Sequence, residues 1–294
     1  MKILITGGTG FIGHNTAIFL KNNGFDVIVF DKKLTEFSMK RLNGIKIIKG
    51  DINSKAIRNA LDGIDIVIHA AAYISVGESI RKPLMYFKNN VLGTLNVVNS
   101  CIDKKVKLIF LSSASVYGEP LFLPISESHP TNPISTYALT KLMGEEIIKF
   151  YFKKGFIILR LFNVYGPGQS STYAGVITKF IERIKNNKPP IIYGDGLQTR
   201  DFIHVYDVAQ AIKLCIEKGI ENEIINIATG RPISIRDLSE LIIKLSGSSH
   251  KPIFTRPRAG DIKHSYADIT KAERLLGFKP RISIEEGLKE LLSS

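Results

Sequence analysis

The first thirteen residues constrain the fold more than any other part of the chain. They read Met-Lys-Ile-Leu-Ile-Thr-Gly-Gly-Thr-Gly-Phe-Ile-Gly, a short apolar run followed by glycines at positions 7, 10 and 13. Glycines there permit a tight turn, close approach of the backbone to a pyrophosphate, and close packing of a helix on the strand. Taken alone, the spacing Gly-x-x-Gly-x-x-Gly could be only a glycine-rich turn. At the first strand of an alternating chain it predicts a dinucleotide site at Gly7, Gly10 and Gly13.

The first half of the chain alternates between two kinds of segment. Short runs rich in isoleucine, valine, leucine and phenylalanine predict strands at Ile3–Thr6, Asp26–Phe30, Lys46–Lys49, Ile66–His69, Lys107–Ser112 and Phe156–Arg160. Helical periodicity between them predicts helices at Phe11–Asn22, Ser54–Leu61, Tyr86–Cys101 and Thr136–Lys153. Such alternation implies parallel pairing of the strands and a doubly wound sheet.

The rhythm changes after Arg160, where a loop-like stretch is followed by shorter elements. Their patterns predict helices and strands at Val176–Lys185, Ile191–Tyr193, Val205–Lys218, Glu223–Ile227, Ser234–Ser246 and Ile269–Leu276. We therefore expect an α/β fold, a Rossmann-type doubly wound parallel sheet with a smaller, interleaved C-terminal α/β domain. The expected dinucleotide-binding domain spans residues 1–165, with 199–227 returning to it, and the expected substrate domain spans 166–198 and 228–294.

Composition excludes several classes of protein. The hydrophobic fraction of 44% is that of a folded domain, and no apolar run approaches the roughly 20 residues that span a bilayer. The start of the chain lacks the pattern of a signal peptide, and Cys101 and Cys215 suit a reducing compartment, so we expect a cytoplasmic protein. The net charge of +13 comes without an aromatic-studded basic stripe, which favours a solvated surface that helps to bind an anionic substrate over a nucleic-acid interface.

Residues after the second and third predicted strands bear on the choice of dinucleotide. Asp31 ends the second strand, where a carboxylate can accept hydrogen bonds from both adenosine ribose hydroxyls. It would repel a 2′-phosphate and so favours NAD, whereas Lys32 and Lys33 directly after it leave NADP open. Asp51 and Ile52 suit a contact to the adenine edge, although Asp51 could be an ordinary helix cap.

Hydroxyl groups and a tyrosine–lysine pair follow the fifth predicted strand. Ser113 and Tyr137 can reach one pocket at the edge where α/β sheets bind ligands. Tyr137 and Lys141 lie one helical turn apart on the same face. An ammonium there favours the phenolate, so Tyr137 could take a proton near neutral pH. His69, at the end of the fourth strand, is interpreted as a packed histidine rather than a catalytic base.

Motifs along nearly the whole chain occur in one order. They include Thr6-Gly-Gly-Thr-Gly-Phe-Ile-Gly, His69-Ala-Ala-Ala, Val76-Gly-Glu-Ser, Asn89-Asn-Val-Leu-Gly-Thr, Ser112-Ser-Ala-Ser-Val-Tyr-Gly, Tyr137-x-x-x-Lys and Arg160-Leu-Phe-Asn-Val-Tyr-Gly-Pro. Gly194-Asp-Gly-x-x-x-Arg-Asp-Phe-Ile-His-Val-x-Asp-Val and Arg258-Ala-Gly-Asp continue the series. In this combination the chain resembles the extended short-chain dehydrogenase/reductase family, and within it the UDP-glucose 4-epimerases and related nucleotide-sugar epimerases.

The resemblance implies NAD as cofactor, a UDP-sugar as substrate and no metal. Besides the glycines, the expected NAD site consists of Phe11, Ile12, Asp31, Asp51, Ile52, Ala70, Ala71, Asn90, Tyr137, Lys141 and Phe162, to which we add Lys32. The expected substrate site consists of Ser113, Tyr137, Asn163, Arg200, Arg258, Asp261 and Ser265. In it Arg200 and Arg258 would bind the diphosphate, because the planar guanidinium pairs with phosphate oxygens.

The implied reaction is 4-epimerisation of a UDP-hexose through a 4-keto sugar. Tyr137 would take the proton of the 4-hydroxyl while hydride passes from C4 to NAD, with Lys141 lowering the tyrosine pKa and Ser113 relaying the proton. Members that dehydrate their sugar carry Thr-Asp-Glu where this chain has Ser113-Ala-Ser115, which argues against a 4,6-dehydratase. Two alternatives stay open, a keto-sugar reductase that releases its cofactor and a non-catalytic NAD-sensing protein.

The resemblance also implies a homodimer and a specificity residue. The segments Tyr86–Cys101 and Thr136–Lys153 would pair across a two-fold axis. In the resembled epimerases, a residue shortly after Arg-x-Gly-Asp forms a wall near the sugar C2 substituent, where an aromatic ring excludes an N-acetyl group. That position is Ser265 here, so we expect UDP-N-acetylhexosamines to be accepted alongside, or in preference to, UDP-glucose and UDP-galactose, unless Tyr266 fills the gap.

Overall fold

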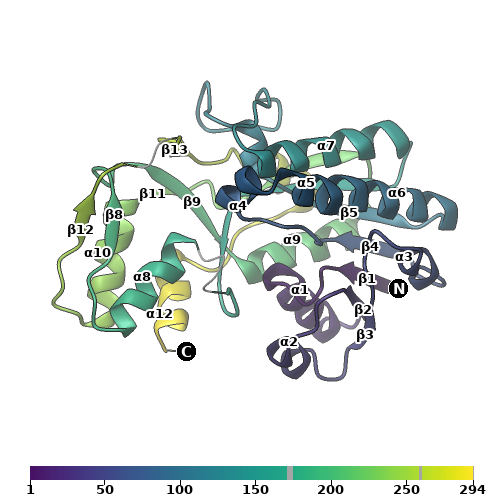
Figure 1. Cartoon of the computed structure of the whole chain (residues 1–294), viewed down its shortest axis with the longest axis horizontal. Coiled ribbons are helices and arrows are strands. Elements are labelled where there is room, and N and C mark those ends of the chain that lie inside the picture. The colour runs from purple at the N-terminus through teal and green to yellow at the C-terminus, as the bar shows by residue number, and fades with distance from the viewer. Residues whose placement is uncertain (171–174, 258–259, 294) are drawn as a thin grey trace.

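A seven-stranded sheet forms the centre of the larger part of the molecule (Figure 1). The computed structural model describes residues 1–170, 175–257 and 260–293. The strands are β1 (Lys2–Thr6), β2 (Asp26–Asp31), β3 (Lys46–Lys49), β4 (Ile66–His69), β5 (Lys107–Ser113), β6 (Phe156–Leu161) and β10 (Glu223–Ile227). All pair in parallel in the order β10-β6-β5-β4-β1-β2-β3. This is the strand order of a doubly wound dinucleotide-binding fold.

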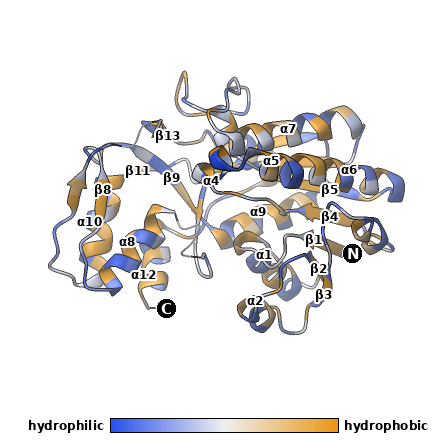
Figure 2. Cartoon of the chain, in the orientation of Figure 1, coloured by the Kyte–Doolittle hydropathy of each residue, from blue (hydrophilic) through white to orange (hydrophobic). Residues whose placement is uncertain are grey.

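Helices cover both faces of this sheet (Figure 1). On one face α1 (Phe11–Asn22) and α9 (Val205–Lys218) join the strands in one hydrophobic core. On the other face α6 (Gly93–Lys104) and α7 (Thr136–Tyr151) join them in a second. The strands are coloured mostly as hydrophobic in Figure 2, as expected for a sheet buried between two helical layers.

Shorter helices complete the larger part of the molecule. They are α2 (Glu36–Arg41), α3 (Ala56–Ala60), α4 (Val76–Arg81), α5 (Pro83–Tyr86) and α11 (Thr270–Leu276). A π-helical turn (Phe87–Leu92) lies between α5 and α6, and a 3₁₀ turn (Ala114–Tyr117) follows β5.

The smaller part holds two short sheets. The first contains β7 (Asn163–Tyr165), β9 (Thr199–His204), β11 (Pro232–Ser234) and β13 (His264–Ser265), and the second pairs β8 (Ile191–Tyr193) with β12 (Ile253–Thr255). Three helices pack with them around a third hydrophobic core, namely α8 (Val176–Lys185), α10 (Ile235–Ser246) and α12 (Ile284–Ser293). The chain passes between the parts more than once, since β9 belongs to the small sheet and β10 to the large one. The division into two domains stays a prediction.

The predicted fold class is confirmed, and one predicted helix differs in form. Tyr86–Cys101 is not one regular helix, because the π-helical turn interrupts it. The wider turn brings two successive side chains, Asn89 and Asn90, to buried positions, and π-helical insertions of this kind are frequent at functional sites.

Two further expectations concern cysteines and membranes. Cys101 and Cys215 are free thiols buried in the helical layers. Within the described part of the chain, no helix has both the length and the apolar character needed to cross a membrane.

Candidate active site

A cavity of about 740 Å³ opens where β1 and β2 end, and we call it the glycine-loop cavity. The lining includes eight residues that the sequence assigned to the cofactor: Gly7, Gly10, Phe11, Asp31, Lys32, Ile52, Ala70 and Ala71. The carboxyl ends of parallel strands are where open α/β sheets bind ligands.

The three glycines of the turn serve two different purposes. Gly7 has φ +66°, and a Cβ on it would lie 2.6 Å from the Ala71 backbone. A Cβ on Gly13 would lie 2.3 Å from the carbonyl oxygen of Gly7, so both positions require glycine for packing. A Cβ on Gly10 would meet only that oxygen, at 3.1 Å. Gly10 caps α1 without a side-chain hydrogen bond, which leaves an open cradle at the helix start that fits a dinucleotide phosphate.

Asp31 faces this cavity with most of its acceptor positions occupied. One carboxylate oxygen accepts from the Thr9 backbone N–H at 3.1 Å and the Thr9 hydroxyl at 2.6 Å, and the other accepts from the Lys33 N–H at 3.0 Å. A carboxylate has about four lone-pair positions. Asp31 therefore keeps roughly one free position for a ribose hydroxyl, where two such contacts had been expected.

Lys32 is held by neighbours on the cavity wall. Its ammonium donates to the Asn89 side chain at 2.8 Å, lies 3.8 Å from the Asp51 carboxylate, and lies 4.7 Å from the centre of the Tyr73 ring. The positive charge of Lys32 is therefore already paired with neighbouring groups of the protein and is not free to bind the 2′-phosphate of NADP. This arrangement supports the preference for NAD.

Replacing Asp31 by alanine is expected to relax the preference for NAD over NADP by about tenfold or more, because hydrogen bonds to a charged group contribute about 1.5–3 kcal/mol. The measurement is the affinity of the cofactor-free protein for each nucleotide. Asp26→Ala, at the exposed opposite end of β2, is the matched control and should change neither affinity. A wild-type protein that binds NADP more tightly would contradict the assignment.

A second cavity of about 450 Å³ adjoins the first, and we call it the tyrosine cavity. Phe11, Ile74 and Gln169 line both cavities. The tyrosine cavity collects seven further residues that the sequence had assigned to the cofactor or the substrate: Ile12, Ser113, Tyr137, Phe162, Asn163, Arg200 and Asp261. A dinucleotide in the first cavity and a substrate in the second would therefore meet.

Ser113 and Tyr137 both line the tyrosine cavity, and Ser113 lies close enough to lower the pKa of the Tyr137 phenol. Ser113 Oγ accepts from the Ser115 N–H at 3.2 Å and from the Ser115 hydroxyl at 2.9 Å. Its own proton is therefore available for the phenol oxygen. Burial raises the pKa of Tyr137, and the Ser113 side chain lowers it.

Lys141 lies under Tyr137 in the same helix but does not line either cavity. Its ammonium donates to the Leu111 carbonyl at 2.7 Å and lies 4.8 Å from the centre of the Phe110 ring. Burial lowers the pKa of Lys141 to about 8, against the opposing charge of Glu145. Burial and Ser113 are the main influences on the Tyr137 pKa in this arrangement, and the expected effect of the Lys141 ammonium on it stays a prediction.

His69 occupies the packed position that the sequence had suggested. Its ring nitrogens contact the Thr6 hydroxyl at 2.7 Å and the Thr94 hydroxyl at 3.0 Å. Burial, with a smaller contribution from the Lys141 charge, lowers the pKa of His69 to about 3. A neutral histidine with both nitrogens occupied is a structural group rather than a base.

The expected substrate residues divide into several groups. Arg200 reaches the tyrosine cavity, where its guanidinium donates to Asp261 at 3.0 Å and to its own strand at the Thr199 carbonyl at 2.8 Å. The Asn163 amide donates to the Asp201 carbonyl at 2.9 Å. Ser265, on β13, pairs in register with Arg200 but does not line the cavity. Arg258 lies outside the described residues.

Two residues of the expected cofactor site, Asn90 and Asp51, line neither cavity and are hydrogen-bonded to neighbouring residues instead. Asn90 accepts from the Tyr73 N–H at 2.9 Å and donates to the Tyr73 carbonyl at 2.9 Å and the Thr140 hydroxyl at 3.1 Å. The Asp51 side chain accepts from the Asn53 N–H at 2.9 Å, which is the capping-type role kept open for it.

Four residues at or near these cavities were not predicted from the sequence. Thr9 holds Asp31, Asn89 holds Lys32, and Gln169 lies in both cavities. Ser79 accepts from the Tyr137 N–H at 3.1 Å and so fixes the start of α7. Ser79 lies in the quoted Val76-Gly-Glu-Ser motif, which was the available signal for it.

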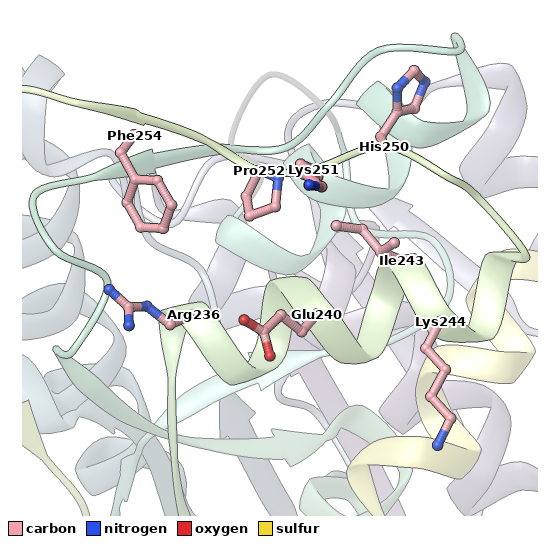
Figure 3. A pocket seen from close by; sticks show the side chains of 8 residues that line it. All are labelled: Arg236, Glu240, Ile243, Lys244, His250, Lys251, Pro252 and Phe254. Atoms are coloured by element: carbon pink, nitrogen blue, oxygen red, sulfur yellow. The ribbon is translucent and has the colours of Figure 1, made fainter.

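Another hollow on the molecule carries none of these groups. It is a groove of about 660 Å³ along α10, lined by Arg236, Glu240, Ile243, Lys244, His250, Lys251, Pro252 and Phe254 (Figure 3). The Arg236 guanidinium lies 5.4 Å from the centre of the Phe254 ring and donates to the Asp195 carbonyl at 2.9 Å. The groove is larger than the tyrosine cavity but smaller than the glycine-loop cavity, so the site is identified by the chemically suited residues of the two adjoining cavities and not by size.

The fold and the two cavities define an NAD-binding enzyme of the Rossmann type. The sequence profile described as the NAD dependent epimerase/dehydratase family matches residues 3–228. The chain belongs to this family, and NAD is its cofactor.

Solved structures extend the comparison over nearly the whole chain. A UDP-N-acetylglucosamine 4-epimerase from Methanobrevibacter ruminantium M1 is 37% identical, with 99% of this chain and 97% of that chain covered and a TM-score of 0.93. A UDP-glucose 4-epimerase from Thermotoga maritima is 36% identical, with 100% and 98% covered and a TM-score of 0.93. A UDP-glucuronic acid 4-epimerase from Bacillus cereus, solved with UDP-glucuronic acid and NAD, is 34% identical, with 100% and 98% covered and a TM-score of 0.91. The chain is an NAD-dependent nucleotide-sugar 4-epimerase, an isomerase.

Proposed function

We propose that this epimerase interconverts UDP-glucose and UDP-galactose and accepts their N-acetylhexosamine forms. The observation that carries the proposal is that Ser113 and Tyr137 line a cavity that shares three residues with the glycine-loop cavity. A sugar hydroxyl beside Tyr137 would then lie next to the cofactor. The UDP-sugar matches support a nucleotide sugar in this cavity, while their named substrates differ in the C2 and C5 substituents.

The proposed chemistry assigns one task to each side chain. Tyr137 removes the proton of the sugar 4-hydroxyl and later returns it from the same oxygen. Ser113, oriented by Ser115, donates to the phenol oxygen and so stabilises its ionised form. NAD, when bound, supplies the hydride acceptor and the positive charge of the oxidised nicotinamide. Lys141 adds a second positive charge below the tyrosine, and Arg200 binds the diphosphate.

A panel of substrates tests this function. The purified protein would be incubated, without added nucleotide, with UDP-glucose, UDP-galactose, their N-acetyl forms and UDP-glucuronate, and the products separated by chromatography. We expect 4-epimers of both the plain and the N-acetylated hexoses. Turnover of UDP-glucuronate alone would overturn the substrate assignment. Formation of a keto sugar with stoichiometric reduction of added NAD, in place of the 4-epimers, would overturn epimerisation in favour of a nucleotide-sugar oxidoreductase that releases its cofactor.

Ser265→Tyr is expected to lower turnover of UDP-N-acetylhexosamines by on the order of tenfold or more while largely sparing UDP-glucose. Ser265 does not line the tyrosine cavity, but it is partly buried and pairs in register with Arg200, which does, so we expect a ring added there to reach into the cavity. The measurement is kcat/KM for both substrate types. Lys263→Tyr, at an exposed position two residues earlier, is the matched control. Equal loss for both substrates would show that Ser265 is not the gate.

A homodimer through α6 and α7 is part of the proposal. Large apolar side chains are exposed on these helices, among them Ile102, Leu139, Tyr151 and Phe150, the last 72% exposed. A partner helix pair would cover them, and exposed patches of this kind mark interaction surfaces.

Light scattering is expected to give twice the mass of one chain for the wild type and a monomer for Phe150→Glu, because a buried unpaired carboxylate opposes association. Leu121→Glu is the matched control, since Leu121 is 77% exposed and belongs to neither helix. A wild-type monomer at micromolar concentration would contradict the proposed interface.

A further inference from the structure

Three ionisable side chains are buried together between α7 and the large sheet, and two of them, Glu145 and Arg160, have no role in the chemistry described above. The exposed fractions are 0% for Glu145, 4% for Arg160 and 5% for Lys141. Burying charges without close partners is strongly unfavourable. Such a group is retained only where its partners and geometry are well matched.

The Glu145 carboxylate connects three elements. It accepts from the Ser112 hydroxyl on β5 at 2.5 Å, and from Arg160 on β6 through Nη2 at 2.7 Å and Nε at 3.1 Å. Ser112 and Arg160 are register partners in adjacent parallel strands. Glu145 thus fastens α7 to two neighbouring strands with charge-assisted hydrogen bonds, which are stronger than neutral ones.

Lys141, one helical turn before Glu145 in α7, is also hydrogen-bonded to β5. Its ammonium donates to the carbonyl of Leu111, the residue before Ser112. The two anchoring side chains of α7 therefore bind two consecutive residues of β5, Leu111 and Ser112, which directly precede Ser113. Tyr137 lies one helical turn before Lys141 in α7, and Ser113 directly follows the two anchored residues of β5. The two anchors therefore set the separation between Tyr137 and Ser113.

Among the residues that the structure describes, Glu145 is the one group of opposite charge that acts on Lys141. On α7 the ionisable neighbours are Tyr137 and Glu145, from β4 His69 faces it, and β5 contributes the Phe110 ring and a carbonyl. On β6 the nearest charged group is Arg160, which is paired with Glu145. His69 is neutral because burial and the Lys141 charge lower its pKa to about 3. Glu145 is thus the group that opposes the loss of the lysine proton caused by burial.

We propose that Glu145 is a positioning residue of the epimerase, which keeps Lys141 charged and holds α7 at the correct distance from Ser113. The proposal rests on the function proposed above, in which Lys141 acts as a cation beneath Tyr137. Glu145 itself touches neither cavity. Its effect on the reaction passes through Lys141.

The test follows the titration of Lys141 directly in the NAD-bound enzyme. The ¹³Cε signal of Lys141 in protein labelled at lysine is assigned by its loss in Lys141→Met, and its midpoint is measured against pH. Glu145→Gln keeps the shape and the contacts to Ser112 but removes the charge. We expect its midpoint to fall below that of the wild type, and turnover above the midpoint to fall about tenfold for each unit of that change.

Controls separate this effect from a general loss of structure. Glu146→Gln, on the exposed neighbouring residue paired with Lys149, should leave midpoint and turnover unchanged. If Glu145→Gln fails to fold because Arg160 is left unpaired, Glu145→Gln with Arg160→Met removes both charges, and we expect the low midpoint there too.

Each outcome decides between the two proposals. A lower midpoint with turnover that recovers at lower pH supports the role of Glu145. An unchanged midpoint in a folded variant overturns it and leaves the function proposed above untouched. A lower midpoint with unchanged turnover overturns the role of Lys141 in the reaction, and with it the role of Glu145 as a positioning residue.

Discussion

Replacing Tyr137 by phenylalanine is expected to lower the turnover number by about 10²–10⁴-fold, the contribution of a positioned acid–base group. The substitution removes one oxygen, whose pKa Ser113 lowers, and keeps the partly buried ring. Bound NAD and the melting temperature should therefore stay close to those of the wild type. Steady-state kinetics, cofactor absorbance and thermal unfolding measure the three quantities.

Tyr151→Phe is the matched control for this substitution. Tyr151 ends the same helix and is 47% exposed, so loss of its hydroxyl should leave turnover unchanged. If Tyr137→Phe keeps near wild-type turnover, the base has been assigned to the wrong residue.

Lys141→Met is expected to lower turnover by about 10²-fold or more and to reduce the fraction of enzyme that retains NAD through purification. Methionine keeps the unbranched stem but removes the ammonium that contacts Leu111. This one substitution therefore removes the positive charge that is proposed to act both beneath Tyr137 and at the nicotinamide ribose. The measurements are kcat and the ratio of NAD to protein after gel filtration.

Lys149→Met provides the comparison, because Lys149 lies on α7 with an exposed partner, Glu146. It should affect neither quantity. Full turnover of Lys141→Met with bound NAD would exclude both proposed roles of the lysine.

Much of the fold was accessible to sequence reasoning because buried parallel strands are nearly continuous apolar runs. Lys46–Lys49 and Ile66–His69 were predicted with the bounds that β3 and β4 have, and Phe11–Asn22 with those of α1. Short elements such as β13 were not predicted, since two residues carry no periodicity. The π-helical turn was missed because it depends on where Asn89 and Asn90 find partners in other segments.

The candidate site was accessible in part for a similar reason. Glycine spacing and the Tyr137–Lys141 interval are local patterns, so they could be read directly. The Thr9 contacts of Asp31, the captured Lys32 and the Arg160–Glu145 pair join segments far apart in the sequence. The pKa of Tyr137 could not be predicted either, because it depends on burial that only the folded chain creates.

Hydride return to the same carbon is the central claim of the proposed function, and an isotope label tests it most directly. UDP-glucose carrying deuterium at C4 would be converted by the purified enzyme without added nucleotide, and the UDP-galactose formed analysed by mass spectrometry and NMR. The account predicts that the product retains deuterium at C4, because hydride leaves and re-enters that position within one bound complex. Product with hydrogen at C4, or a keto sugar formed with stoichiometric reduction of added NAD, would contradict it.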